Sequence, residues 1–210
     1  MSSLIQKIDE MIEERSLLKH KFYQMWSDGK LTLDSLTGYS KEYFQLVKAV
    51  PGFMTPIIEM APGTVVSELT SNQLEEMQHI KLWIGFAHAL GVPENELKEY
   101  DGLEKTKQAV SKLSSLMNTY EGGTCAMYAF EKEIPKISQI KLDGLADFYG
   151  ITSDEATEYF KQHTEADIRH ASSWRKILEN STQHEKMIEI ADQSISAQNM
   201  LLDSCYEAYC

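Results

Sequence analysis

The chain has 210 residues, of which 42% are hydrophobic, and it carries a formal net charge of −12. This length and apolar content suit one domain with a well-buried core. The acidic charge disfavours sequence-independent binding to nucleic acid, which needs Lys and Arg beside the phosphates. No apolar run approaches the roughly 18–20 residues of a membrane span, so a soluble protein is expected.

The amino terminus, "MSSLIQKIDEMIEERS", has no basic start followed by an apolar block, and it predicts a helix and no secretory signal. The three cysteines are Cys125, Cys205 and Cys210, with no C-x-x-C pair among them. This usage predicts reduced thiols and argues against a disulfide framework. Both features favour the cytoplasm.

Apolar residues recur with a period of 3.6 along the chain and strand signals are almost absent, so helices are predicted throughout. The first helix is expected from about Ser3 to Trp26. The second opens at "LTLDSL" and should bend or break at Pro51 and Pro56. The third is expected from about Val65 to Leu90. The connection "GVPENELKEYDG" then holds one short turn of helix.

A fourth helix is expected from about Leu103 to Tyr120. The fifth starts near Thr124, should kink at Pro135, and ends near Phe148. The capping pattern of "TSDEATEYF" opens the sixth helix, and the seventh runs from about Thr182 to the carboxyl terminus. The sequence therefore predicts an all-α fold: one domain over residues 1–210, built as a bundle of about seven helices.

The segment "YFKQHTEADIRHASSW" places two imidazoles and a carboxylate on the inward face of a helix. His163, Asp167 and His170 fall within a roughly 60° sector, and the same stripe continues through Trp174 and Ile177. An unpaired Asp in an apolar interior is costly, and a divalent cation removes that cost. A metal site is favoured, while an internal hydrogen-bond network stays open from spacing alone.

A second stripe lies in "NQLEEMQHIKLWIGFAHAL", at steps of four and three residues. Its members are Asn72, Glu76, His79, Trp83, Phe86 and Leu90. His79 is therefore directed inward with Asn72 and Glu76 beside it. Glu75 is on the margin of this sector. For Glu75 or Glu76 taken alone, a solvated carboxylate is the favoured interpretation, and His79 is the better ligand candidate.

The third element is Glu131, which follows the apolar run in "TCAMYAFEKEIP". A carboxylate is rarely buried without a partner, so Glu131 needs a metal or a hydrogen-bonded neighbour. The three segments together offer the histidines and carboxylates of a non-haem di-iron site in a helical bundle.

Four segments occur in a specific order: "HKFYQMWSDGKLTLDSLTGYSKEYF", "HIKLWIGFAHALGV", "YAFEKEIP" and "HTEADIRH". Together they resemble the haem-oxygenase-like helical proteins, a group that includes TenA and the pyrroloquinoline quinone synthase. The resemblance is to the di-metal oxidase branch that contains the chlamydial protein associating with death domains. It runs from His20 to about Trp174 and implies a haem-oxygenase-like fold and a homodimer.

In that branch, two metals are held by Glu-x6-His, a Glu before "xxxP", and His-x3-Asp-x2-His. Carried over by position, the resemblance implies the ligands His79, Glu131, His163, Asp167 and His170. The first Glu of the family falls on Asn72, whose neutral carbonyl binds a cation less strongly than a carboxylate. Three outcomes stay open. Glu76, one helical turn later on the same face, replaces the missing carboxylate; or one metal is held weakly; or the site has lost its redox role.

The resemblance also implies a synthase that supplies para-aminobenzoate for folate synthesis, with one of its own tyrosines as the aromatic source. That tyrosine corresponds to Tyr23, and the lysine implicated as amino donor corresponds to Lys141. Tyr39 and Tyr43 match further aromatic positions near that site. The sequence without the resemblance predicts a core aromatic for Tyr23 and a surface charge for Lys141.

The expected function is thus a metal-dependent oxidase or oxygenase with two divalent ions, iron or manganese, and O₂ as co-substrate. Its substrate is a small molecule or a group of the chain itself. A TenA-like hydrolase of thiamin-type pyrimidines is an alternative, with Cys125 as nucleophile, although no activating base lies nearby in the sequence. A cofactor-free oxidase of the quinone-synthase kind and a non-enzymatic interaction protein are the others.

Overall fold

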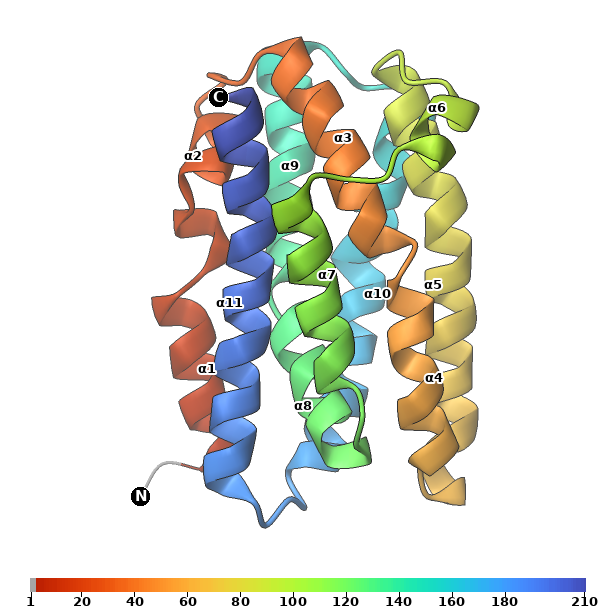
Figure 1. The fold of residues 1–210 in the computed structure, drawn as a ribbon, viewed down its shortest axis with the longest axis vertical. Coiled ribbons are helices and arrows are strands. Elements are labelled where there is room, and N and C mark those ends of the chain that lie inside the picture. Colours follow the sequence, from red (N-terminus) through yellow and green to blue (C-terminus); the bar gives the residue numbers. More distant parts are fainter. Residues whose placement is uncertain (1–2) are drawn as a thin grey trace.

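The computed structural model describes residues 3–210, which form a bundle of long helices lying nearly parallel to one another (Figure 1). The described residues contain no strand, so the all-α prediction is confirmed. The helices are α1 (Leu4–Glu14), the 3₁₀ turn η1 (Leu17–Lys19), α2 (Lys21–Ser27), α3 (Leu33–Val47), α4 (Val50–Met60), α5 (Gly63–Ala89), α6 (Glu94–Glu99), α7 (Glu104–Leu116), α8 (Tyr120–Glu131), α9 (Ile134–Tyr149), α10 (Asp154–Leu178) and α11 (His184–Tyr209).

Helix α10 lies within the bundle, behind α7 and α8 in Figure 1, and packs against α5, α8 and α9. Helix α11 packs against α3, α7 and α8 on the other side of the molecule. Because α10 contacts both α5 and α8, the three predicted polar stretches can meet in one place.

The expected first helix from Ser3 to Trp26 is wrong, because it is divided into α1, η1 and α2. Glu133, just before α9, causes the division: its carboxylate accepts hydrogen bonds from the Ser16 hydroxyl and, at 3.0 Å, from the Leu17 backbone nitrogen. The His20 side chain then caps α2. A long-range contact thus overrides the helical periodicity of this stretch.

Prolines divide two other expected helices. Helix α3 ends at Val47, and Pro51 lies in the first turn of α4, where proline is well tolerated. Pro56 lies within α4 without ending it. The expected fifth helix breaks after Glu131 instead of kinking at Pro135, which lies in the first turn of α9. The short turn predicted between the third and fourth helices is α6.

None of the helices in the described range, residues 3–210, has the length and hydropathy to cross a bilayer. The single-domain organisation, the homodimer and the cytoplasmic location stay predictions.

Candidate metal centre

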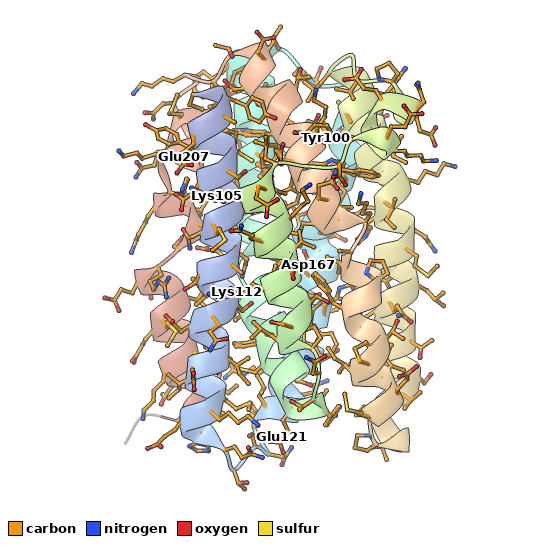
Figure 2. The ribbon with its side chains drawn as sticks, in the orientation of Figure 1. Tyr100, Lys105, Lys112, Glu121, Asp167 and Glu207 are labelled. Atoms are coloured by element: carbon orange, nitrogen blue, oxygen red, sulfur yellow. The ribbon has the colours of Figure 1, made fainter. Side chains whose placement is uncertain are left out.

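Seven candidate ligands come from three helices and meet inside the bundle, at the level where Figure 2 labels Asp167. All seven side chains are buried, with exposed fractions of at most 7%. They are Asn72, Glu76 and His79 from α5, Glu131 from the end of α8, and His163, Asp167 and His170 from α10. The two polar stripes predicted from spacing therefore do point inward.

Glu76 lies between two groups of potential ligands. One group is Glu76, His79 and His163, and the other is Glu76, Asp167 and His170; within each group the ligand atoms lie within 4.8 Å of one another. Glu76 Oε2 is 3.2 Å from His79 Nδ1, and Glu76 Oε1 is 3.4 Å from His170 Nδ1. The two carboxylate oxygens thus face two different positions, as in a carboxylate that bridges two cations.

Unpartnered polar atoms mark this cluster. Among the described residues, seven buried side-chain nitrogen or oxygen atoms lack a hydrogen-bond partner, and all but Glu121 Oε2 belong here. They are Asn72 Nδ2, His79 Nδ1, Glu131 Oε1, both Asp167 carboxylate oxygens and His170 Nδ1. Buried polar atoms without partners are expensive, and imidazole nitrogens and carboxylate oxygens are ligands for divalent cations. The residues therefore fit a metal site.

For two of the three histidines, hydrogen bonds around the cluster select the nitrogen that faces it. His163 Nδ1 lies 2.7 Å from the Tyr159 carbonyl, an acceptor, so Nδ1 carries the proton and Nε2 has the free lone pair. His170 Nε2 lies 3.2 Å from Glu75 Oε2 and donates to it, which leaves Nδ1 for a cation. Such outer contacts orient histidine ligands and raise their basicity.

The protonation of the cluster also reflects the crowding of charge. Burial raises the pKa of Glu131 well above its usual range. Burial acts in the same direction on Glu76, but the neighbouring His170 and His79 imidazoles outweigh it and lower the pKa of Glu76. Burial would lower the pKa of His170, yet the Asp167 and Glu76 carboxylates raise it to about 11. Without a metal ion, His170 therefore keeps its extra proton, and this positive charge balances the carboxylates in the place of a cation.

A small cavity of about 10 Å³ adjoins the candidate ligands. Its lining includes the candidate ligands Glu76, Glu131, Asp167 and His163, together with Tyr43. This is room for roughly one water-sized molecule. A small diatomic molecule is thus better matched to this cavity than an organic substrate.

A second buried polar cluster surrounds Lys141 of α9, whose exposed fraction is 4%. Its Nζ donates to the Tyr39 hydroxyl at 2.6 Å, and the Tyr39 and Tyr23 hydroxyls are 3.2 Å apart. The same Nζ lies 4.7 Å from the ring centre of Tyr23 and 4.9 Å from that of Tyr43. Burial lowers the pKa of Lys141 to about 7, so much of this amine is neutral near neutral pH. The surface position expected from sequence alone is wrong, because α9 turns this residue into the core.

Ring contacts connect the lysine cluster to the ligands. The ring centres of Tyr23 and Tyr39 are 6.3 Å apart, and those of Tyr39 and Tyr43 are 5.2 Å apart. The path continues from Tyr43 to Trp83 at 4.9 Å, from Trp83 to Tyr159 at 4.7 Å, and from Tyr159 to the candidate ligand His163 at 4.0 Å. An unbroken series of aromatic rings therefore runs from Tyr23 to the metal centre.

Comparison with known proteins agrees with this geometry. The family described as "Iron-containing redox enzyme" matches residues 38–200, which include all seven candidate ligands. The chain belongs to this family. The resemblance drawn from the sequence is thus confirmed, and the protein is a redox enzyme.

Curated relatives and solved structures are similar over the full length of this redox enzyme. The 4-aminobenzoate synthase of Nitrosomonas europaea is 32% identical, over 98% of this chain and 92% of that protein. The 4-aminobenzoate synthase of Chlamydia trachomatis is 29% identical, over 99% and 97%. A TenA homologue from P. horikoshii has a TM-score of 0.83 at 13% identity, over 98% and 99% of the two chains. A CADD-like protein from Nostoc punctiforme has a TM-score of 0.76 at 21% identity, over 99% and 97%. The two solved structures confirm the fold.

Two residues of the redox enzyme support the ligands without having been predicted to do so. Glu75, expected as a solvated carboxylate, bonds His170 and is held by Arg169 at 2.9 and 3.3 Å. Trp174, expected as core, donates from Nε1 to Glu131 Oε2 at 2.6 Å. The i+4 step from His170 to Trp174 was visible in the sequence, but the α8 partner of Trp174 was not.

Cys125 does not have the surroundings of a nucleophile. It is buried in α8, and its thiol donates to the Met187 carbonyl at 3.1 Å. Burial raises the pKa of Cys125 to about 12, so the thiolate is scarce at neutral pH. These contacts favour a structural thiol in the redox enzyme and weigh against the TenA-like hydrolase.

Proposed function

We propose that the protein is a di-metal oxidase that makes 4-aminobenzoate from its own Tyr23 side chain, with Lys141 as the source of nitrogen. The observation that carries this proposal is the buried Lys141 amine, which shares a hydrogen-bonded cluster with Tyr23. The names of the curated relatives support the product.

Two divalent ions, iron or manganese, would be held by the residues described above. One would take Glu76, His79 and His163, and the other Glu76, Asp167 and His170, with Glu131 beside the cavity. Glu76 thus supplies the carboxylate that the family has at the position of Asn72. When bound, such a metal pair supplies the redox chemistry that makes O₂ an oxidant.

The atoms of Tyr23 match those of the product. In tyrosine the phenol oxygen is para to Cβ, and in 4-aminobenzoate the amine is para to the carboxylate carbon. The conversion breaks the Cα–Cβ bond, which leaves a hydrogen on Cα and thus a glycine residue at position 23, and it oxidises Cβ to a carboxylate. It also exchanges the ring C–O bond for a C–N bond, and the phenol oxygen leaves as water when the imine forms. O₂ accepts the electrons. Lys141 gives up its nitrogen when an imine to the oxidised ring isomerises and is hydrolysed, which leaves an aldehyde at its Cε.

The residues around this cluster prepare that exchange. Burial keeps much of the Lys141 amine unprotonated, which a nucleophilic nitrogen requires. Tyr39 lies between the two reacting groups, accepts from Lys141 and can pass a proton to or from the Tyr23 oxygen. The rings from Tyr39 to Tyr159 offer a path by which an electron leaves Tyr23 towards the metal ligands. The cavity of about 10 Å³ favours a protein-derived substrate over an external organic one.

The experiment is anaerobic loading with Fe²⁺ and Mn²⁺, exposure to O₂, and mass spectrometry of the intact chain, its peptides and the small-molecule fraction. We expect at most one 4-aminobenzoate per chain, together with loss of the Tyr23 side chain and conversion of Lys141. Tyr23→Phe and Lys141→Met should bind metal normally and release no product. Several equivalents of product from an unmodified chain would contradict the proposal, as would a chain that takes up no metal.

A further inference from the structure

The ligands are buried, so a cation needs a route from solvent to reach them. A surface groove of about 750 Å³ lies along the contact between α5 and α10. Nine of its ten lining residues have polar side chains, among them Glu68, Asn72, Arg169, Ser173 and Lys176. Both of the helices that form it carry ligands farther along.

The groove includes one of the seven candidate ligands, Asn72, and residues adjacent in sequence to others. Asn72, which lines it, has an exposed fraction of 4%, and its amide nitrogen lacks a hydrogen-bond partner. Asn72 lies one helical turn before Glu76 on the same face of α5. On α10, Arg169 lines the groove and directly precedes the ligand His170. The floor of the groove is therefore next to both helices' ligands.

The chemistry of the lining suits a hydrated hard cation. Such cations bind carboxylate, amide, hydroxyl and water oxygens. Glu68 supplies the carboxylate, and the Ser173 hydroxyl donates to it and fixes it in the groove. Glu68, Asn72 and Glu76 succeed one another at four-residue steps, roughly 6 Å apart along the axis of α5. Asn72 presents an amide whose oxygen can face the groove or the centre.

A salt bridge lies between the groove and the ligands. The Glu75 carboxylate accepts from Arg169 at 2.9 Å and from His170 Nε2 at 3.2 Å. The Arg169 side chain is 61% exposed, Glu75 is 30% exposed and His170 is fully buried. Because the Arg169 charge is compensated by Glu75, the main opposing charge in the groove is Lys176, which lies two turns beyond Arg169 on α10. Arg169 and Asn72 both line the groove, so displacing the exposed Arg169 side chain would widen it.

We propose that this groove is an entry site, separate from the resident metal positions, where a hydrated divalent cation binds Glu68 and Asn72 before it passes the Glu75–Arg169 pair. This inference rests on the proposed function, because it concerns the same metals. It predicts a kinetic signature: a residue of the route changes the rates of uptake and release together and leaves the equilibrium affinity unchanged.

Mn²⁺ is the probe, with uptake followed by the loss of the free-ion EPR signal and release followed after addition of excess EDTA. We expect Glu68→Gln to slow both rates about three- to tenfold, since removing a charge weakens electrostatic steering. The final Mn²⁺ content and Kd should not change. Arg169→Met should accelerate both rates. Glu59→Gln, an exposed carboxylate of α4 outside the groove, is the matched control and should behave as the wild type.

Unchanged rates in Glu68→Gln would overturn the entry site while leaving the metal centre intact. A weaker Kd with faster release alone would also overturn it, because that pattern identifies Glu68 as a resident ligand. A wild-type chain that takes up no Mn²⁺ would instead refute the proposed function, so the two failures are distinguishable.

Discussion

The metal centre and the lysine cluster are both buried polar sites, but they accommodate the loss of water in opposite ways. The metal centre gathers three carboxylates, and six of its buried polar atoms, three of them carboxylate oxygens, lack a hydrogen-bond partner among residues 3–210. In the lysine cluster, Lys141, Tyr39 and Tyr23 bond one another, and burial favours the neutral amine. The metal centre thus needs cations to satisfy its buried polar atoms, whereas the lysine cluster satisfies its own hydrogen bonds once Lys141 is neutral. Metal ions should therefore govern the first site, and pH should govern the second.

The sharpest test of this contrast is Glu76→Gln. Glu76 belongs to both groups of ligands, so its loss should remove both metals and abolish product formation. Elemental analysis of the purified variant should find iron and manganese near zero per chain. Asn72→Ala is the matched control one turn away, and it should keep both metals. If the two variants lost metal equally, Asn72 and not Glu76 alone would hold the cations.

The second test concerns stability and pH in the metal-free protein. The folded-state pKa of Lys141 is lowered to about 7 from an ordinary value of 10.5, so between these values the unfolded chain binds a proton that the folded chain does not. The free energy of unfolding should rise with pH across this window, by roughly 3–5 kcal/mol in total from this group. Lys141→Met should lack that rise.

Urea unfolding at pH 7 and pH 10 measures the difference between wild type and variant. Lys136→Met is the control, since Lys136 is an exposed lysine of the same helix, and it should follow the wild type. Parallel curves for wild type and Lys141→Met would show that the buried amine is charged in the folded state.

The smallest expected effect comes from Glu75→Gln. Removing the carboxylate that orients His170 should weaken metal binding about 10–100-fold, the usual range for an outer partner of a histidine ligand. Competition with a fluorescent chelator measures the change. Glu155→Gln is the matched control, because Glu155 makes a similar contact to the exposed His88, 2.8 Å from its Nδ1. An unchanged Kd in Glu75→Gln would mean that helix packing alone orients His170.

The sequence by itself determined the helical fold and the inward faces of α5 and α10. A helix repeats every 3.6 residues, so the steps from Asn72 to His79 and from His163 to His170 placed these side chains on one side without any tertiary information. The apolar run before Glu131 singled out that carboxylate. The resemblance added Tyr23 and Lys141 as positions, since their pairing crosses helix boundaries that periodicity does not describe.

Only the tertiary structure decided how these faces meet. It assigned Glu76 to both ligand groups, placed Lys141 in the core, and gave Glu75 and Trp174 their ligand partners. It also interrupted the expected first helix at Ser16, where the carboxylate of Glu133, from a distant segment, accepts hydrogen bonds from the Ser16 hydroxyl and the Leu17 backbone nitrogen. The physical reason is the same in each case. Local spacing determines the side of a helix on which a residue lies, whereas its partners come from other helices, and only packing brings those within reach.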